Sequence, residues 1–531
     1  MEKKKRLKKI SLHPVTTYIL LTFGVVFLSF ILSIFKVSAT YSSINVTSNE
    51  LEKTIVTVNN MLNYDGIKFI ISNASLNFVK STTLSTLIIT LIGVGIADVT
   101  GFIQAFMKKR LIKIDPKILT FFLILISIFS SIVNEVGYAI LIPLGALLFL
   151  FNGRNPLAGI VSSFAGVAFG YSISFFVGTI DIDLIPYTIR AAQLIDDTFY
   201  VRMTSNLYIM IASCFIIAIV ATFITEKFVV KKLGRYVLKT RDDLGQTKEI
   251  EYLDLQYEEQ KKIKEEQLEK RGLKYATIAA IIIISIFVYM IIPGLPLSGV
   301  LLDLDEIAYV DQLFGVNSYF QDGFTYMMCI LFSLTGIFYG IGSKSIKSDK
   351  DLINKLSDNF SSIGLIIIMI FFSTQFIAIF KESNIGTVFV VLLTNILKSL
   401  PLSGAVLIII SMIVISISNI FVTTSVSKWV IISPTLVPTM MQLNISPQFA
   451  QFIFRAGESM SNGITPLLAY FVVYLGYLNI YNKDKEKPIT VSKSLDIVMP
   501  YFIGLSLTWI FIIITWYIIG LPLGPGVYPT L

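Results

Sequence analysis

The sequence predicts an all-α integral membrane protein with about nine transmembrane helices and two re-entrant helical hairpins. Three observations support this fold class. Of the 531 residues, 54% are hydrophobic and 15% are charged, whereas about 25% of a soluble chain is charged. The apolar residues form runs of roughly 20, the length of helix that crosses a bilayer core. Two further regions, residues 117–187 and 388–480, are apolar but interrupted by Gly, Pro, Ser, Asn and Thr.

Continuous apolar runs, each bounded by polar or charged residues, predict the regular spans. They cover residues 15–38, 83–107, 203–225, 275–293, 324–341, 360–380 and 497–519. The two interrupted regions indicate hairpins followed by broken helices, which are tolerated in a bilayer only where they line a cavity or pack inside protein. Because such a pair occurs in each half, the sequence predicts an inverted-repeat architecture typical of secondary transporters.

These elements divide the chain into five segments. A basic segment and a charged connector, residues 1–14 and 227–274, are expected in the cytoplasm. The first half, residues 15–226, contains a hairpin at about 113–150 and a broken helix at about 153–187. Middle spans occupy residues 275–386. The second half, residues 387–531, contains a hairpin at about 400–443, a broken helix at about 448–480 and the last span at about 497–519.

The distribution of charge predicts the orientation in a bacterial inner membrane. With an odd number of spans, the Lys- and Arg-rich segments at 108–110, 227–274, 344–350 and 483–487 fall on one side. The acidic segment 303–322 and the polar loops 39–80 and 184–202 fall on the other. The positive-inside rule therefore predicts a cytoplasmic N-terminus and an extracytoplasmic C-terminus. The net charge is +8. The Lys and Arg residues that produce it lie beside spans rather than on one basic face, so no nucleic-acid partner is expected.

Residue usage excludes several kinds of chemistry. The only histidine, His13, precedes the first span, and the two cysteines, Cys214 and Cys329, lie inside predicted spans, where a thiol packs as a small apolar group. No zinc-protease helix, nucleophile elbow or P-loop is present, which disfavours an enzyme or an ATP-driven pump. We therefore expect no cofactor, and coupling to H⁺ or Na⁺ through carboxylates, hydroxyls or backbone carbonyls.

Polar breaks occur in paired order in the two halves. Ser131-Ile132-Val133-Asn134 resembles Ser416-Ile417-Ser418-Asn419, and each is followed by a second break, at residues 178–181 and 461–466. A broken helix exposes N–H groups at one end and carbonyls at the other, which can hold an anion and a cation. The alternative is that Gly and Pro merely kink packed helices.

Few ionisable residues occur at apparent membrane depth, where each is costly unless paired or hydrated. Asp181 follows a Gly-Thr break and has no cation nearby in the sequence, which favours a role as an ion or proton carrier. Arg455 and Glu458 are spaced to form an intrahelical pair, so a purely structural role is equally consistent with them. The other ionisable residues at this depth are Asp98, Glu135 and Lys428. Of these, Asp98 and Glu135 are expected near the cytoplasmic boundary of the membrane.

Over nearly its whole length the chain resembles the p-aminobenzoyl-glutamate transporter family, AbgT. The motifs that carry the resemblance include residues 137–138, 141–144, 155–159, 164–167, 178–181, 371–377, 383–386, 427–429, 455–459, 464–467 and 520–526. The resemblance implies a homodimer of nine-span protomers that imports p-aminobenzoyl-glutamate or exports sulfonamide-type antimetabolites. It also implies substrate-site roles for Asp181, Asn419, Trp429, Pro438, Arg455 and Glu458. The chain departs from the family pattern at Glu458, Val426 and Ser174.

The resulting hypothesis is a cation-coupled transporter of p-aminobenzoyl-glutamate or related aromatic amide carboxylates. Arg455 is expected to face the substrate carboxylate, Trp429 to stack on its ring, and Asp181 with Glu458 to carry coupling charge. Further oxygens and a possible Na⁺ site near three asparagines are expected from Thr179, Thr424, Thr465, Asn134, Asn419 and Asn462. The alternatives are sodium-coupled transport of another carboxylate or dipeptide-like anion, and a channel.

Overall fold

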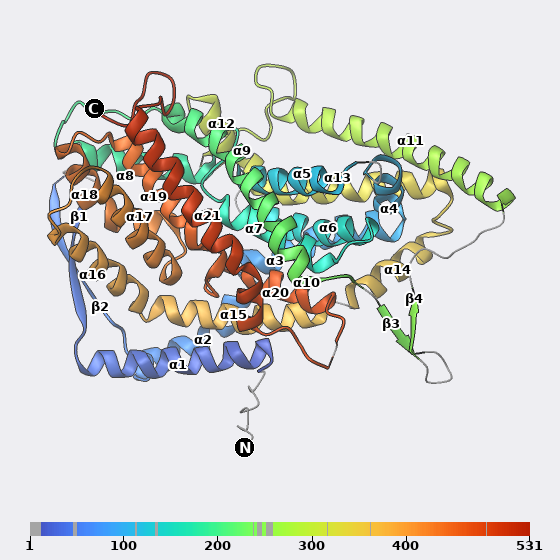
Figure 1. Ribbon diagram of the computed structural model, residues 1–531, viewed down its shortest axis with the longest axis horizontal. Coiled ribbons are helices and arrows are strands. Elements are labelled where there is room, and N and C mark those ends of the chain that lie inside the picture. The colour runs from blue at the N-terminus through green and yellow to red at the C-terminus, as the bar shows by residue number, and fades with distance from the viewer. Residues whose placement is uncertain are drawn as a thin grey trace, which may run out of the picture.

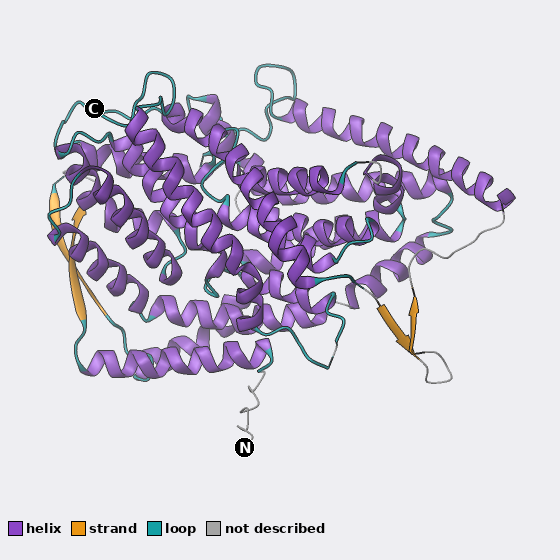
Figure 2. Ribbon diagram, viewed as in Figure 1, coloured by secondary structure: helices purple, strands orange, loops and turns teal. Residues whose placement is uncertain are grey.

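The computed structural model describes residues 12–45, 50–111, 114–132, 136–236, 238–241, 247–250, 259–315, 317–361, 363–484 and 486–531. Helices make up most of these residues, and the strands form two small antiparallel pairs (Figure 2). Within the described residues, eight helical segments are long and apolar enough to cross a membrane. The chain is therefore a predominantly helical integral membrane protein, as the sequence predicts.

Most of the long helices follow the predicted continuous spans (Figure 1). The residue before α1, His13, accepts a hydrogen bond from Val15 N, and Pro14 occupies the first turn, where its missing N–H costs nothing. The span predicted at 83–107 is divided at Gly101, which has a φ of 84°. The elements are α1 (Pro14–Ile34), α3 (Thr82–Val99), α4 (Phe102–Phe106), η1 (Met107–Leu111), η3 (Met203–Asn206), α9 (Leu207–Ile224), η4 (Thr225–Val229), α10 (Val230–Leu233), α11 (Glu259–Met290), α13 (Tyr319–Ser343), α15 (Gly364–Glu382) and α21 (Val491–Ile519).

The first interrupted region forms a helix pair and then two helices separated by a loop. The pair is α5 (Pro116–Phe129), extended by η2 (Ser130–Ile132), and α6 (Val136–Phe151). The interrupted helix consists of α7 (Pro156–Phe169), whose residues are all buried, and α8 (Thr179–Ala192). Residues 170–178 connect these two helices. This break brings a helix N-terminus and its unpaired N–H groups into the protein interior.

The second interrupted region has the same order of elements. The pair is α17 (Gly404–Phe421) and α18 (Ser425–Gln442), and the interrupted helix consists of α19 (Pro447–Ser461), η5 (Asn462–Ile464) and α20 (Phe471–Ile480). Helix α19 is buried along its whole length. It contacts α8, α17 and α18, and these helices gather at the left of Figure 1. The inverted relation between the halves, and the membrane path of each helix pair, stay predictions.

Several elements were not anticipated from the sequence. Residues expected as a polar loop instead form a hairpin of β1 (Ser38–Ile44) and β2 (Leu51–Thr57), paired Ser38 to Thr57, followed by α2 (Tyr64–Val79). Asn395 Nδ2 donates to Thr40 O at 2.9 Å, which joins this hairpin to α16 (Ile385–Ser399). From Glu259 on, the charged connector continues without a break into the next span as one helix, α11. The other elements are β3 (Leu238–Arg241), β4 (Thr247–Ile250), α12 (Tyr309–Phe314), α14 (Asp349–Ser361) and α16 (Ile385–Ser399).

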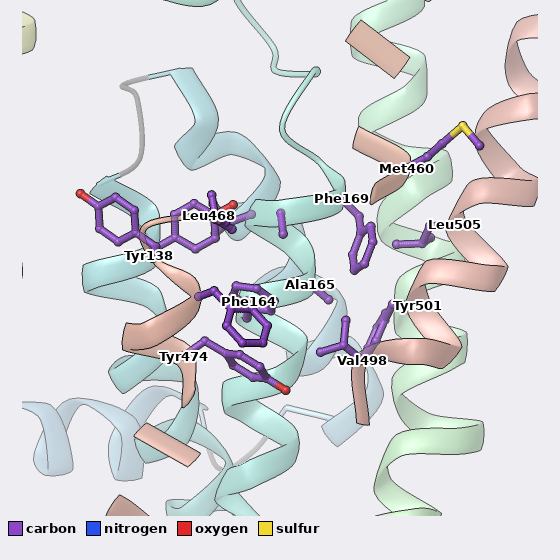
Figure 3. Close-up of a cluster of buried hydrophobic side chains, with 14 of the residues drawn as sticks. Tyr138, Phe164, Ala165, Phe169, Met460, Leu468, Tyr474, Val498, Tyr501 and Leu505 are labelled. Carbon is purple, nitrogen blue, oxygen red and sulfur yellow. The ribbon is translucent and has the colours of Figure 1, made fainter. Parts of the chain in front are cut away.

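An aromatic core joins α7 to elements of the second half (Figure 3). The ring of Phe164 on α7 stacks on Tyr474 of α20, with centroids 4.1 Å apart and planes 12° apart. At the end of α7, Trp509 of α21 donates its indole N–H to Phe169 O at 3.1 Å. Each aromatic pair contributes about 0.5–1.5 kcal/mol beyond the area it buries. These contacts fix the broken helix of the first half against the second half.

Close helix packing in the first half depends on two glycines. Gly145 of α6 and Gly159 of α7 face each other, and a Cβ added to Gly159 would lie 2.0 Å from Gly145 O. Such small residues allow membrane helices to approach closely, where van der Waals contact replaces the hydrophobic driving force that lipid does not supply. The hairpin arm and the broken helix therefore pack backbone against backbone.

Candidate functional site

Arg455 lies at the centre of a buried group of charges, on α19. This helix starts at a Ser-Pro pair: the side chain of Ser446 accepts a hydrogen bond from Phe449 N, and Pro447 occupies the first turn. Two turns later the helix presents Arg455, which is only 2% exposed. An ion buried to this degree needs charged partners.

Arg455 contacts partners on three elements. Its Nε donates to Asp181 Oδ1 at 3.1 Å, and its Nη1 donates to Glu458 Oε2 at 3.1 Å. Its Nη2 donates to the carbonyl of Tyr171 at 2.8 Å, and the guanidinium carbon lies 4.8 Å from the centre of the Tyr171 ring. Nη1 also lies 3.4 Å from Ser425 Oγ. The planar guanidinium therefore joins both broken helices to the start of α18.

A second cation, Lys428, pairs with Glu458. Lys428 Nζ lies 2.6 Å from Glu458 Oε1, and both side chains are fully buried. Lys428 Nζ also donates to Asn419 Oδ1 of α17, whose Nδ2 donates to Glu458 O at 3.1 Å. Ser425 Oγ donates to Glu458 Oε2 at 2.9 Å. Two cations and two carboxylates thus balance one another in the interior.

Asp181 is held at the N-terminal end of α8. It stands in the first turn, after the N-cap residue Gly178, where the positive end of the helix dipole stabilises a carboxylate. Gln451 Nε2 donates to its backbone carbonyl at 3.2 Å. With 14% of its side chain exposed, Asp181 is the most accessible of the four paired charges, because the others are at most 3% exposed.

A cavity of about 530 Å³ adjoins this cluster. Its wall includes Tyr171 and Ser425, which both contact Arg455. Pockets for small molecules usually measure about 300–1,000 Å³ and combine apolar walls with a few polar groups. The other lining residues are Thr82, Ser85, Thr86, Ile89, Val136, Ile180, Asp183, Gln321, Asp322, Thr325, Thr423, Thr424, Val426 and Tyr470.

The structure brings four of the sequence-predicted residues into direct contact: Asp181, Asn419, Arg455 and Glu458. Thr424 is exposed at the N-cap of α18, where it lines the cavity. Pro438 lies on the same helix, about 15 Å along the axis from the cluster residue Lys428 at the usual rise per residue. It is therefore remote from the charge cluster.

Trp429 lies next to the cluster but is fully buried. Its indole N–H donates to Thr188 Oγ1 at 2.9 Å, and its ring centre lies 4.6 Å from that of Phe454. Thr188 in turn donates to Gln451 Oε1 at 2.6 Å. The stacking role predicted for Trp429 does not fit this conformation, because protein groups already cover the ring.

Three other predicted residues hold the helix breaks in place. Thr179 Oγ1 donates to Ile132 O at 3.4 Å, and Thr465 Oγ1 donates to Ile420 O at 2.7 Å. Asn462 Nδ2 contacts Tyr138 Oη at 3.5 Å. Asn134, and with it one candidate Na⁺ position, lies outside the described residues. The described residues contain no group of three or more His, Cys, Asp or Glu side chains that could hold a metal ion.

Sequence reasoning assigned no role to Lys428, Ser425, Tyr171 or Asp183. A lysine within an apolar segment indicates a paired or functional charge. The sequence does not show which residue it pairs with, because Glu458 is 30 residues away. Tyr171 and Ser425 carry no comparable signal, because their places depend on how the loops fold. Asp183 lines the cavity, and its Oδ1 has no hydrogen-bond partner within the described part of the chain.

Many membrane-length helices, together with paired charges buried beside a cavity, define a multi-pass membrane transporter. The chain belongs to the AbgT putative transporter family, whose family model matches residues 6–531. The p-aminobenzoyl-glutamate transport protein of Escherichia coli (strain K12) is 28% identical over 519 residues, which cover 98% of this chain and 94% of that protein.

Two solved structures are also similar. MtrF of Neisseria gonorrhoeae, which represents a class of antimetabolite efflux pumps, is 31% identical to this chain. The match covers 98% of each chain and has a TM-score of 0.47. The YdaH transporter of Alcanivorax borkumensis is 25% identical, with 97% of this chain and 100% of that chain covered and a TM-score of 0.47.

Proposed function

We propose that this protein is a secondary active transporter of p-aminobenzoyl-glutamate or related aromatic amide carboxylates. Its direction is uptake or the efflux of sulfonamide-type antimetabolites, driven by a proton or sodium gradient. The observation that carries the proposal is the position of Arg455, buried between two carboxylates and in contact with two cavity-lining residues. A guanidinium in such a place is suited to a planar carboxylate.

Substrate recognition follows from the groups around Arg455. A substrate carboxylate that reaches Arg455 past Tyr171 and Ser425 replaces Asp181 as the partner of Nε. The aromatic ring of the substrate lies against Tyr171 or Tyr470, the aromatic residues of the cavity wall. Val426, where the family pattern has a serine, gives that wall an apolar patch. Trp429 supports the site from behind through Thr188.

Coupling follows from charge balance. The cluster carries two positive and two negative charges, so an added substrate carboxylate leaves one negative charge in excess. A proton or cation bound at Asp181 restores neutrality and frees Arg455 for the substrate. Substrate and ion then bind with positive coupling, because each favours the other's site. The charged groups that face Asp181 are Arg455, Glu458 and Asp183.

A second candidate function is the transport of a dipeptide-like anion. The cavity wall includes two carboxylates, Asp183 and Asp322, as well as Tyr171 and Ser425, which contact Arg455. Carboxylates in this position suit a substrate that has an amino group as well as a carboxylate. A panel of dicarboxylates, dipeptides and p-aminobenzoyl-glutamate in a thermal-shift assay separates the two candidates, because a ligand of the native state raises the melting temperature.

We further propose a homodimer with a cytoplasmic N-terminus and an extracytoplasmic C-terminus. The charge bias of the loops supports this orientation. Labelling of single cysteines placed near each terminus with a membrane-impermeant reagent tests the orientation. Light scattering of the detergent-solubilised protein tests the dimer.

The decisive experiment for the function is a flux assay in liposomes. The purified protein is reconstituted, and labelled p-aminobenzoyl-glutamate or a sulfonamide is followed under imposed proton or sodium gradients. We expect saturable flux that depends on one gradient and shows countertransport, which a channel does not. Absence of flux of every tested carboxylate under both gradients, with protein correctly inserted, refutes the proposal.

A further inference from the structure

We infer that the ammonium group of Lys428 occupies a cation site formed by Asn419 and Glu458, as a covalently attached substitute for a monovalent cation. The inference rests on the proposed function, since the site is part of the same charge cluster. Lys428 thus occupies the position beside Asn419 where the sequence predicts a Na⁺ ion. Lys428 is thereby a positioning residue, which acts on the substrate through Glu458 and Arg455.

The geometry around Lys428 Nζ is that of a cation site. The group lies 2.6 Å from a carboxylate oxygen, Glu458 Oε1, and donates to an amide oxygen, Asn419 Oδ1. Nζ is also 5.8 Å from the centre of the Phe454 ring, whose face attracts positive charge. Carboxylate and amide oxygens are the ligands that hard cations prefer. No part of Lys428 is exposed to solvent.

The amide of Asn419 is oriented for this purpose. Its Nδ2 donates to Glu458 O at 3.1 Å and lies 3.4 Å from Ser461 Oγ. An amide nitrogen offers only donors, so both acceptors fix it on the side away from Lys428. Asn419 Oδ1 is therefore directed at the ammonium. The polar break that ends α17 builds the site together with α18 and α19.

Glu458 needs this cation because its two oxygens have separate partners. Ser425 and Arg455 bind Oε2, at 2.9 and 3.1 Å. Apart from Lys428, no donor among the described residues forms a hydrogen bond with Oε1. Without the ammonium, one oxygen of a fully buried carboxylate would face no positive group, which is strongly unfavourable. Arg455 would then be drawn toward Glu458 and away from the substrate.

This arrangement has a consequence for coupling. The position next to Asn419 is filled by a group that cannot leave, so no sodium ion enters or departs there during transport. The exchangeable charge of the cluster is then at Asp181, which is the partly exposed member. Sodium dependence should appear at Asn419 only when the lysine is removed.

The test is cation rescue of Lys428→Ala, measured first as thermal stability in detergent. In choline chloride we expect the variant to melt well below the wild-type protein. Sodium or potassium chloride should restore at least half of that loss in a saturable manner, and this gain over choline should be larger than any gain that the same salts give the wild-type protein. Arg154→Ala is the matched control: it removes the cation of another ion pair, Arg154 to Glu226 at 2.7 Å, outside the cluster, and its loss should show no cation-specific recovery.

A double variant, Lys428→Gln with Glu458→Gln, removes both charges and keeps the inference testable if the alanine variant does not fold. We expect it to be recovered in better yield than either single variant and to have a melting temperature that depends on sodium no more than that of the wild type. A double variant no better than the singles overturns the inference, as does a Lys428→Ala protein that melts like the wild type in choline or is not rescued by any monovalent cation.

Flux in liposomes gives a separate reading. If wild-type protein transports, the flux of Lys428→Ala, relative to the wild type in the same salt, should be at least tenfold lower in choline and partly restored by sodium or potassium. A Lys428→Ala protein with undiminished flux in choline overturns the inference and leaves the proposed function intact. A wild-type protein that transports nothing refutes the proposed function, while the melting experiment still decides the role of Lys428.

Discussion

Replacement of Arg455 by lysine tests the central feature of the site, since it keeps the positive charge and removes the planar fork. Arg455 donates to Asp181 and Glu458 at 3.1 Å and to Tyr171 O at 2.8 Å, from three different nitrogens. A single ammonium on a shorter side chain cannot reach all three elements. We expect at least one charge-assisted hydrogen bond to be lost, and each such bond contributes about 1.5–3 kcal/mol.

The expected magnitude follows from that loss. If the lost bond is the one that Nε would donate to the substrate carboxylate, the KM for transport rises about 10- to 150-fold. The melting temperature should also fall, because Asp181 or Glu458 loses a partner in the interior. Liposome flux over a range of substrate concentrations measures KM, and a thermal-shift assay in detergent measures stability.

The matched control is Arg202→Lys, at an arginine that is exposed at the surface. It should leave both KM and the melting temperature unchanged. If Arg455→Lys has wild-type KM and wild-type stability, the guanidinium is not the substrate-binding group and the three hydrogen bonds do not hold the broken helices together. A lower melting temperature with an unchanged KM means that Arg455 is a structural residue only.

Three further predictions concern other parts of the molecule. Asp181→Asn should bind substrate with an affinity that hardly varies with pH, as the amide imitates the protonated acid, whereas wild-type affinity should rise as the pH falls; a variant with the wild-type pH profile contradicts this role. Trp429→Phe should lower stability by about 1 kcal/mol through loss of one hydrogen bond and leave KM within a fewfold of wild type; a hundredfold rise in KM would place the ring in the substrate path. Gly159→Ala should cost about 1–3 kcal/mol, measured as a lower melting temperature, because the new Cβ meets Gly145 O at 2.0 Å; Gly24→Ala, with nothing within 4 Å of the added Cβ, should be neutral.

Hydropathy alone predicted most of the helices. The spans expected at 15–38, 203–225, 324–341 and 497–519 correspond to α1, α9, α13 and α21, because a run of apolar residues long enough to cross a bilayer has no other stable fold there. Polar segments were less predictable. Residues 38–44 and 51–57 pair as two short antiparallel strands, although their alternation of polar and apolar residues is too weak to distinguish them from a loop.

In the candidate site, the sequence identified the charged residues but not their partners. Asp181, Arg455 and Glu458 stand out because lipid penalises each of them. The pairing of Arg455 with Asp181 spans 274 residues of chain, and no periodicity in the sequence reports such a contact. The role of Trp429 also depended on its neighbours, because Phe454 and Thr188 cover the ring that the family resemblance assigned to substrate stacking.

The sequence by itself determined that this chain is a helical membrane protein of the AbgT family, with helix breaks in both halves and costly charges beside them. Those properties are local, since burial in lipid acts on each segment separately. Only the tertiary structure decided which charge meets which, and that Lys428 fills the cation position next to Asn419. The physical reason is that an ion pair depends on distance in space, and here that distance is set by the packing of α8, from the first half of the chain, against α18 and α19 of the second half.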